Sequence, residues 1–173
     1  VSYTDEQGFS ETVTSSSVEI DPIQQVYTQQ ETIAFTPGQN VSIPLLYSAS
    51  NDDNGLSGLT LNVHYNSKRL TPLGENNGVS DMVSATVTNI AVVDDKHNLD
   101  NDSATDKIVQ LLWFSVTNQF PNTPLPGTIA KVAFSTTAAA FDPVTGLDTS
   151  IHYTSTGTAM NHEFIGSSTK LED

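Results

Sequence analysis

The chain has 173 residues, with 6 Lys and Arg against 20 Asp and Glu, which gives a formal net charge of −14 at pH 7. That charge argues against binding to nucleic acid or to an anionic membrane surface, because both need a basic face. The sequence has no cysteine, which excludes disulfides and thiolate metal sites, and it has no run of 18 apolar residues that would span a membrane. Its length suits one domain, and its uncharged polar composition is typical of exported β-modules.

The first 22 residues differ from the rest of the chain. A Tyr-Thr-Asp-x-x-Gly turn at 3–8 precedes a Ser- and Thr-rich alternating segment, which Asp21-Pro22 ends. This segment resembles the closing strand of Ig-like or cadherin-like repeats in large bacterial surface proteins. We therefore predict a lead-in strand or linker from a preceding repeat at 1–22 and a sandwich domain at 23–173. In the alternative, the segment is the first strand of the same sandwich.

Alternation of apolar and polar residues predicts β-strands through the remainder. Apolar side chains occupy every second position at 41–47, 59–65 and 83–87, as in half-buried antiparallel strands. The segment 108–116 is apolar on both faces, which predicts a central strand, and 129–134 predicts another. Turn signals rich in Pro, Gly and Asn recur between these runs, so we expect an all-β, antiparallel β-sandwich of the jelly-roll type.

Three stretches resemble cohesin modules. The sequence TPGQNVSIPL at 36–45 resembles the opening strand of that family, and 55–70 resembles its second element, a Gly-rich entry followed by an alternating strand. The acidic segment, apolar strand and Phe-Pro-x-x-x-Leu-Pro loop within 100–134 resemble a cohesin-like subgroup. The resemblance implies a nine-stranded jelly roll without catalytic chemistry, and cohesins bind dockerins, often through one sheet face. Carbohydrate-binding modules share this architecture, so fold alone does not decide between the two.

An acidic segment is the strongest candidate site. Five aspartates fall within thirteen positions: Asp94, Asp95, Asp100, Asp102 and Asp106. Crowded carboxylates repel one another, and calcium relieves this repulsion by binding six to eight oxygen atoms. The spacing differs from that of an EF-hand. Counted from Asp100, the sixth loop position carries Thr105 instead of Gly, and the twelfth carries Leu111 instead of Glu. We predict a calcium site here; the alternative is a solvated acidic loop.

A second calcium candidate is the Asn-Asp-Asp-Asn-Gly turn at 51–55, with Asp52 and Asp53 as ligands. The same residues also favour a plain turn for backbone reasons. Weaker candidates outside both segments are Asp5, Glu6, Asp142 and Asp148.

The aromatic residues divide into expected core and expected surface. Phe120 lies in a Pro-rich loop and is expected to be exposed and to contact a ligand, together with His97 and Asn101 of the acidic segment. Alternation places the other informative rings in the core: Tyr65, Trp113, Phe114 and Phe134.

The signal for catalysis is poor. The four histidines form no HExxH motif, and Gly-Leu-Ser-Gly at 55–58 is no nucleophile elbow. Thr60, Asn62 and His64 alternate with core residues and are expected to lie on a solvent-wetted sheet face. We therefore expect no enzyme.

Together these features predict a non-catalytic, calcium-stabilised module of an exported bacterial adhesin or surface assembly. Its expected place is extracellular, at the bacterial cell surface, where calcium is abundant. The expected partner is a protein or peptide on another cell or surface, with neighbouring repeats of the same chain as further contacts. A calcium-dependent carbohydrate-binding module and a structural spacer are the alternatives.

Overall fold

The computed structural model describes residues 2–4, 6–12, 21–136 and 149–172. In the first segment, β1 (Ser2–Thr4) and β2 (Ser10–Thr12) pair antiparallel as a two-stranded sheet of their own. The assignment of residues 1–22 to a preceding repeat stays a prediction. No described helix is both long enough and apolar enough to cross a membrane.

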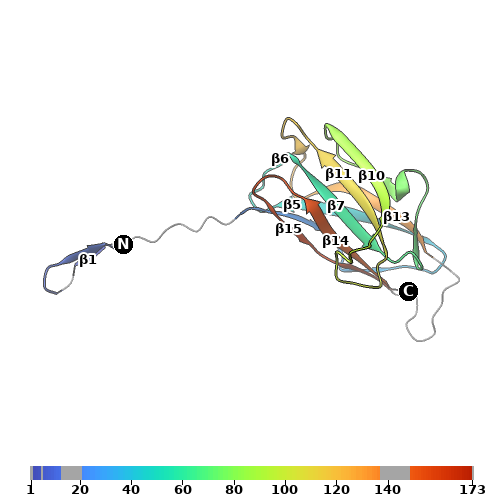
Figure 1. Ribbon diagram of the computed structural model, residues 1–173, viewed down its shortest axis with the longest axis horizontal. Helices are drawn as coiled ribbons and strands as arrows, with labels where there is room; N and C mark the ends of the chain where they lie inside the picture. Colours follow the sequence, from blue (N-terminus) through green and yellow to red (C-terminus); the bar gives the residue numbers. More distant parts are fainter. Residues whose placement is uncertain (1, 5, 13–20, 137–148, 173) are drawn as a thin grey trace.

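One sheet of the sandwich has six strands (Figure 1). All neighbours pair antiparallel except the last two strands, which are parallel. The order is β10 (Val87–Asp94), β11 (Lys107–Phe114), β7 (Gly58–Tyr65), β14 (Thr149–Gly157), β16 (Thr169–Glu172) and β4 (Thr32–Ala34).

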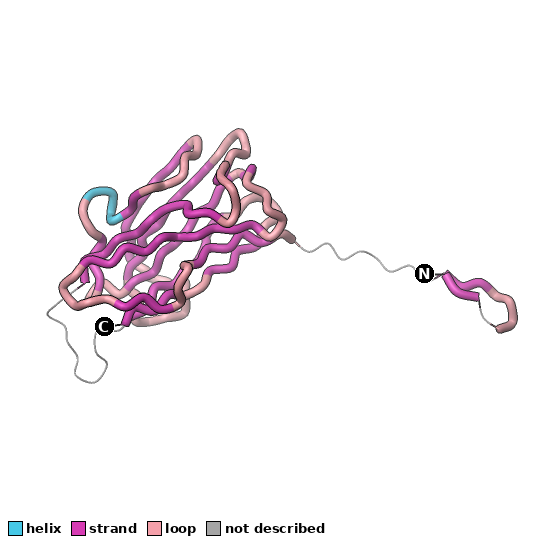
Figure 2. Tube along the Cα trace, turned by 180° about the vertical axis from the view of Figure 1, so that it is seen from behind, coloured by secondary structure: helices cyan, strands magenta, loops and turns pink. Residues whose placement is uncertain are grey.

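The second sheet lies behind the first, and Figure 2 shows the strands of both layers from the other side. Its order is β15 (Glu163–Gly166), β3 (Ile23–Tyr27), β5 (Asn40–Ala49), β13 (Gly127–Thr136) and β8 (Leu70–Pro72), with β9 (Val79–Ser80) also paired to β13. Two short strands, β6 (Gly55–Leu56) and β12 (Phe120–Pro121), pair with each other, and η1 (Glu75–Gly78) is a 3-10 turn.

The core lies between the two sheets and follows the alternation of the sequence. On β5, every second residue from Val41 to Ala49 is buried. The predicted core positions Tyr65, Trp113 and Phe134 are buried, which confirms those expectations. The predicted all-β sandwich is likewise confirmed, and its pairs are antiparallel except for β16 with β4 and β15 with β3.

Two phenylalanines lie opposite to expectation. Phe120 is 0% exposed, and its ring packs against Tyr47 and Trp113 with centroid separations of 5.4 and 5.5 Å. The expectation of an exposed Phe120 is therefore wrong: the pairing of β12 with β6 draws this part of the Pro-rich loop into the core. Phe114, expected in the core, is 48% exposed because it alternates with the buried Trp113.

Candidate functional site

The outer face of the first sheet follows from the strand register. Val109, Leu111 and Trp113 point into the core, so the alternate residues of β11 point outward. Directly paired residues of antiparallel strands lie on the same side, which places the following cross-strand rows on this outer face: Val87 and Phe114; Asn89, Leu112 and Thr60; Ala91, Gln110, Asn62 and Thr154; and Val93, Ile108, His64 and His152.

The two ends of this outer face differ. At one end, Val87 and Phe114 are exposed. At the other, Ile108 is buried although it is outside the core cluster, and His64 is buried too. The expectation that His64 and Asn62 face water is therefore wrong, since both are 0% exposed.

The segment 95–106, which connects β10 to β11, lies at the His64 end. Its two ends are tied together by the Asp95 N–H, which donates to the Asp106 carbonyl at 3.0 Å. The Asp106 N–H in turn donates to the carbonyl of Tyr65, the last residue of β7, at 3.2 Å. These bonds hold the acidic segment beside the end of β7, where its side chains reach His64.

Two of the five aspartates converge on His64. Asp95 Oδ2 lies 2.8 Å and Asp100 Oδ2 3.8 Å from His64 Nδ1, and the three side chains are 0–1% exposed. The other ring nitrogen, Nε2, lies 2.7 Å from Thr154 Oγ1 on β14. We call His64, Asp95 and Asp100 the His–Asp cluster, and among the described residues it is the group of metal-ligating side chains that converges most closely.

The acidic segment also orients both carboxylates. The Leu99 N–H is shared between the two carboxylate oxygens of Asp95, at 3.1 Å from Oδ1 and 3.2 Å from Oδ2. The Asp102 N–H donates to Asp100 Oδ1 at 3.2 Å, and the Thr105 hydroxyl to Asp100 Oδ2 at 2.6 Å. Each carboxylate therefore presents one oxygen to His64 while the local backbone fixes its direction.

The other three aspartates of the segment point elsewhere. Asp94 is exposed and hydrogen bonds to Lys107, which lowers the pKa of its carboxyl. Asp102 Oδ2 lies 3.3 Å from His152 Nε2. Asp106 accepts hydrogen bonds from the Ser67 N–H and hydroxyl. Burial raises the pKa of its carboxyl, but these bonds, a backbone hydrogen bond of Asp106 itself and the charge of Lys107 together lower the pKa below its usual value. The five predicted ligands therefore do not form one chelate.

The other sequence candidates are dispersed. Asp52 and Asp53 are exposed in a turn, where Asp53 Oδ1 accepts the Gly55 N–H at 2.7 Å. Asp5, Asp142 and Asp148 lie outside the described residues, and Glu6 is exposed. These positions remain calcium predictions from the sequence.

The three predicted ligand contacts are separated. Phe120 belongs to the core, whereas His97 and Asn101 are exposed on the acidic segment. Asn101 lines a cavity of about 280 Å³ together with Asp100, His152 and Thr154. The sequence did not indicate His64, His152 or Thr154 as site residues. All three are polar residues at alternate positions of β7 or β14, and this pattern becomes informative only once the register pairs the two strands.

The order Thr154, His64, Asp95 also matches the hydroxyl, imidazole and carboxylate of a hydrolytic triad. Two contacts argue against that chemistry. Thr154 Oγ1 accepts the Asn62 side-chain N–H at 3.2 Å, and Asn62 in turn accepts from Gln110 at 3.0 Å, so the hydroxyl is part of a polar chain across three strands. In a triad a single carboxylate faces the imidazole Nδ1, whereas here the carboxylate of Asp100 faces His64 Nδ1 in addition to that of Asp95. The cluster is therefore better suited to holding a cation than to activating a nucleophile.

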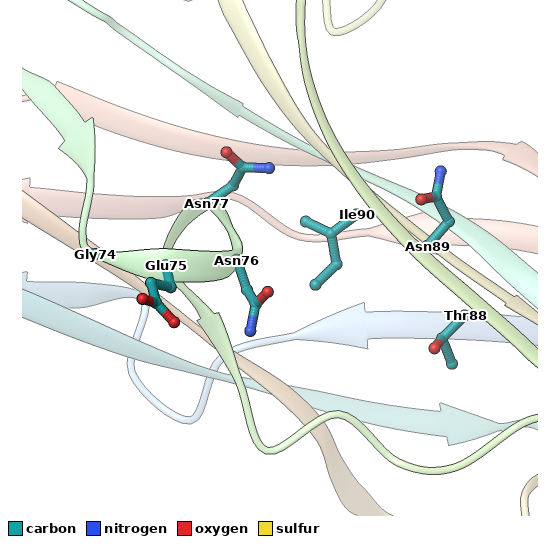
Figure 3. A pocket seen from close by; sticks show the side chains of 7 residues that line it. All are labelled: Gly74, Glu75, Asn76, Asn77, Thr88, Asn89 and Ile90. Carbon is teal, nitrogen blue, oxygen red and sulfur yellow. The ribbon is translucent and has the colours of Figure 1, made fainter.

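A polar groove borders the free edge of β10. The turn 74–78 forms one side and residues 88–90 of β10 the other, enclosing about 630 Å³ (Figure 3). Ile90 is the strand side chain nearest to the turn, whereas the Glu75 side chain points away from β10, and none of the seven lining residues is aromatic. It offers amide and hydroxyl groups without a stacking platform for a sugar ring.

Comparison with solved structures identifies the architecture. The chain matches the cohesin OlpA from Clostridium thermocellum, solved in a type I cohesin–dockerin complex, with a TM-score of 0.55 and 15% identity over 87% of this chain and 98% of that one. It matches the cohesin OlpC of the same organism, also solved with a dockerin, with a TM-score of 0.53 and 15% identity over 92% and 99% of the two chains. No protein-family model and no curated protein sequence matches this chain. The protein has the fold of a cohesin-like β-sandwich module.

Proposed function

We propose that this chain is a non-catalytic protein-binding module that binds its partner on the outer face, at the end formed by Val87, Leu112, Phe114 and Val116. The observation that carries the proposal is the cross-strand pair of Val87 and Phe114, two large apolar side chains that are each 48% exposed.

The local surface suits a protein partner. Leu112 is half-buried on the same face, and Val116, two residues beyond the end of β11, is 65% exposed. Contiguous exposed apolar side chains on a soluble module mark an interaction surface, because burying them on association is favourable. An aromatic ring such as Phe114 is also a frequent anchor of protein interfaces.

The fold neighbours support the same class of function. Both structures described above are cohesins solved in complex with a dockerin, a protein partner. We propose a protein partner for this chain by that analogy of fold, and the exposed apolar end supplies the surface.

The cellular setting belongs to the same proposal. We propose an exported module of an adhesin or surface assembly, supported by the net charge of −14 and the polar composition. Calcium bound at the exposed turn 51–55 is part of this proposal as an ion of minor stabilising effect rather than a reactant.

A carbohydrate ligand is the alternative, and the groove beside β10 is the surface that favours it. Its amide side chains on Asn76, Asn77 and Asn89 are able to bond sugar hydroxyls. The apolar end and the groove are thus separate surfaces that separate substitutions address.

The test uses two double variants, Val87→Ser with Phe114→Ser and Asn76→Ala with Asn89→Ala, against dockerin modules, a displayed peptide library and a glycan panel. We expect a protein or peptide ligand whose binding the first variant loses and the second retains. Binding only to glycans, lost in the second variant, would refute the proposal in favour of the carbohydrate alternative.

A further inference from the structure

We propose that the His–Asp cluster binds one divalent transition-metal ion of the zinc class. The site lies at the opposite end of the outer face from Val87 and Phe114, so it does not rest on the proposed protein-binding function.

The donor geometry matches one ion. Ligands of a tetrahedral ion at about 2.0–2.2 Å lie about 3.3–3.6 Å from each other. The separations from His64 Nδ1 to Asp95 Oδ2 and Asp100 Oδ2, 2.8 and 3.8 Å, bracket that value, and all three donor atoms lie within 4.8 Å of one another. The donors come from β7 and from two positions of the acidic segment, and the hydrogen bonds from Leu99 and Thr105 hold the carboxylates in place.

The negative charge of the cluster favours a bound cation. Asp95 and Asp100 are 0% and 1% exposed, and the ion pairs described for both carboxylates involve His64. With both carboxylates ionised and the imidazole neutral, the cluster carries a charge of −2. Buried charge is costly unless it is compensated. A divalent ion between Nδ1 and the two carboxylates balances that charge.

The donor set selects the class of metal. Imidazole nitrogen suits zinc and its neighbours in the first transition row, whereas calcium prefers an all-oxygen shell of six to eight ligands. Thr154 Oγ1, 2.7 Å from Nε2, fixes the orientation of the ring, as the outer partners of metal-binding histidines do. One histidine with two carboxylates leaves a fourth position open.

A second imidazole lies on the neighbouring strand β14. His152 pairs with His64 across β14 and β7, so the two imidazoles share the outer face. His152 Nε2 is a buried atom that makes no hydrogen bond in the described part of the chain, although Asp102 Oδ2 is 3.3 Å away. His152, Asp100 and Thr154 line the same cavity of about 280 Å³, so an ion in this cavity would meet Asp100, one member of the cluster.

Metal binding has a structural consequence. The ion would join the acidic segment to β7, two parts of the chain that are separate in sequence. We therefore expect it to stabilise the segment 95–106 over the His64 end of the outer face.

The experiment begins with metal-free protein prepared with a chelator. Melting temperature and calorimetric titration are measured with Zn²⁺ alone and with Ca²⁺ alone. We expect one Zn²⁺ per chain and a rise in Tm of about 5–10 °C at a hundredfold excess over Kd, with no comparable effect of Ca²⁺. Co²⁺ serves as a spectroscopic probe and is expected to give visible absorption bands of a low-coordinate nitrogen and oxygen site.

The variant Asp100→Asn keeps the size of the side chain and its acceptor oxygen but removes the charge. We expect it to lose the stoichiometric Zn²⁺ and the Co²⁺ bands. Asp94→Asn, in the same segment but exposed and paired with Lys107, and His97→Ala, an exposed histidine, are the matched controls and should retain both signals.

Three results would overturn the proposal: Ca²⁺ but not Zn²⁺ stabilises the chain, Zn²⁺ binding survives Asp100→Asn, or Zn²⁺ binding is lost in His97→Ala. If Asp100→Asn does not fold, the Co²⁺ spectrum of the wild-type chain decides, since the absence of bands at one equivalent would exclude the site. Loss of the partner in the Val87 and Phe114 variant would leave Zn²⁺ binding intact, so the two proposals fail independently.

Discussion

The imidazole of His64 lies 2.8 Å from the carboxylate of Asp95, although 31 positions separate the two residues, and both side chains are 0% exposed. This contact joins β7, an inner strand of the first sheet, to the segment that follows β10. It therefore fixes the acidic segment over one end of the outer face and leaves the other end, with Phe114, exposed.

The two misassigned phenylalanines provide a matched pair for stability. Phe120→Ala removes a ring packed against Tyr47 and Trp113 and should lower the free energy of unfolding by about 3–5 kcal/mol. Phe114→Ala removes an exposed ring and should change it by about 0.5 kcal/mol or less. Urea unfolding of both variants measures the difference, and equal losses would show that the core boundary is misplaced.

Gly58 allows β7 to approach β11. A Cβ atom there would lie 2.1 Å from the Trp113 carbonyl oxygen, and its φ of +142° disfavours other residues. Gly58→Ala should therefore cost more than about 2 kcal/mol of unfolding free energy. Gly74→Ala separates the two causes, because Gly74 also has a positive φ, +72°, but a Cβ there would meet no atom within 4 Å. A loss as large at Gly74 as at Gly58 would refute the steric explanation.

Buried tyrosines predict a loss of stability in alkali. Burial raises the pKa of Tyr47 and of Tyr153 to about 12. Because the folded state favours the neutral phenol, the stability they contribute is complete below pH 10 and is lost as the pH rises from 10 towards 12. We expect the unfolding free energy to fall over this window by up to about 2–3 kcal/mol for each tyrosine.

The control for the alkaline effect is Tyr153→Phe. It removes a contact of 3.3 Å with Thr169 and should cost about 1 kcal/mol at pH 8. Above pH 10 it should weaken the pH dependence, since it removes one titrating phenol. An unchanged slope between pH 10 and 12 would assign the alkaline loss to other groups.

The sequence predicted the strands well because alternation is a local property. The runs at 41–47 and 59–65 lie within β5 and β7, and the rings of Tyr65, Trp113 and Phe134 are buried as expected. Phe114 was harder to place, because β11 is apolar on both faces and its outward positions alternate with Trp113.

The candidate site was less predictable because it depends on contacts between distant segments. The sequence pointed to the acidic segment but not to His64, whose burial requires the segment 95–106 to lie over the end of β7. Spacing in the sequence also did not distinguish the two aspartates of the cluster, Asp95 and Asp100, from the other three. In the structure Asp94 bonds to Lys107, Asp102 approaches His152 and Asp106 bonds to Ser67. Phe120 was drawn inward by the pairing of β12 with β6, which nothing local in the loop indicates.

We propose that Phe114 and Val87 form a protein-binding surface. Its most direct test immobilises the wild-type chain, Phe114→Ser and Ile165→Ser, and exposes each to the exported proteins of the organism that encodes the chain. Ile165 lies on β15 of the other sheet and is 47% exposed, against 48% for Phe114, so it is a matched control. We predict a protein that binds wild type and Ile165→Ser in a fixed stoichiometry and is lost from Phe114→Ser. A partner that binds all three equally, or no bound protein at all, would refute a protein-binding surface at Phe114.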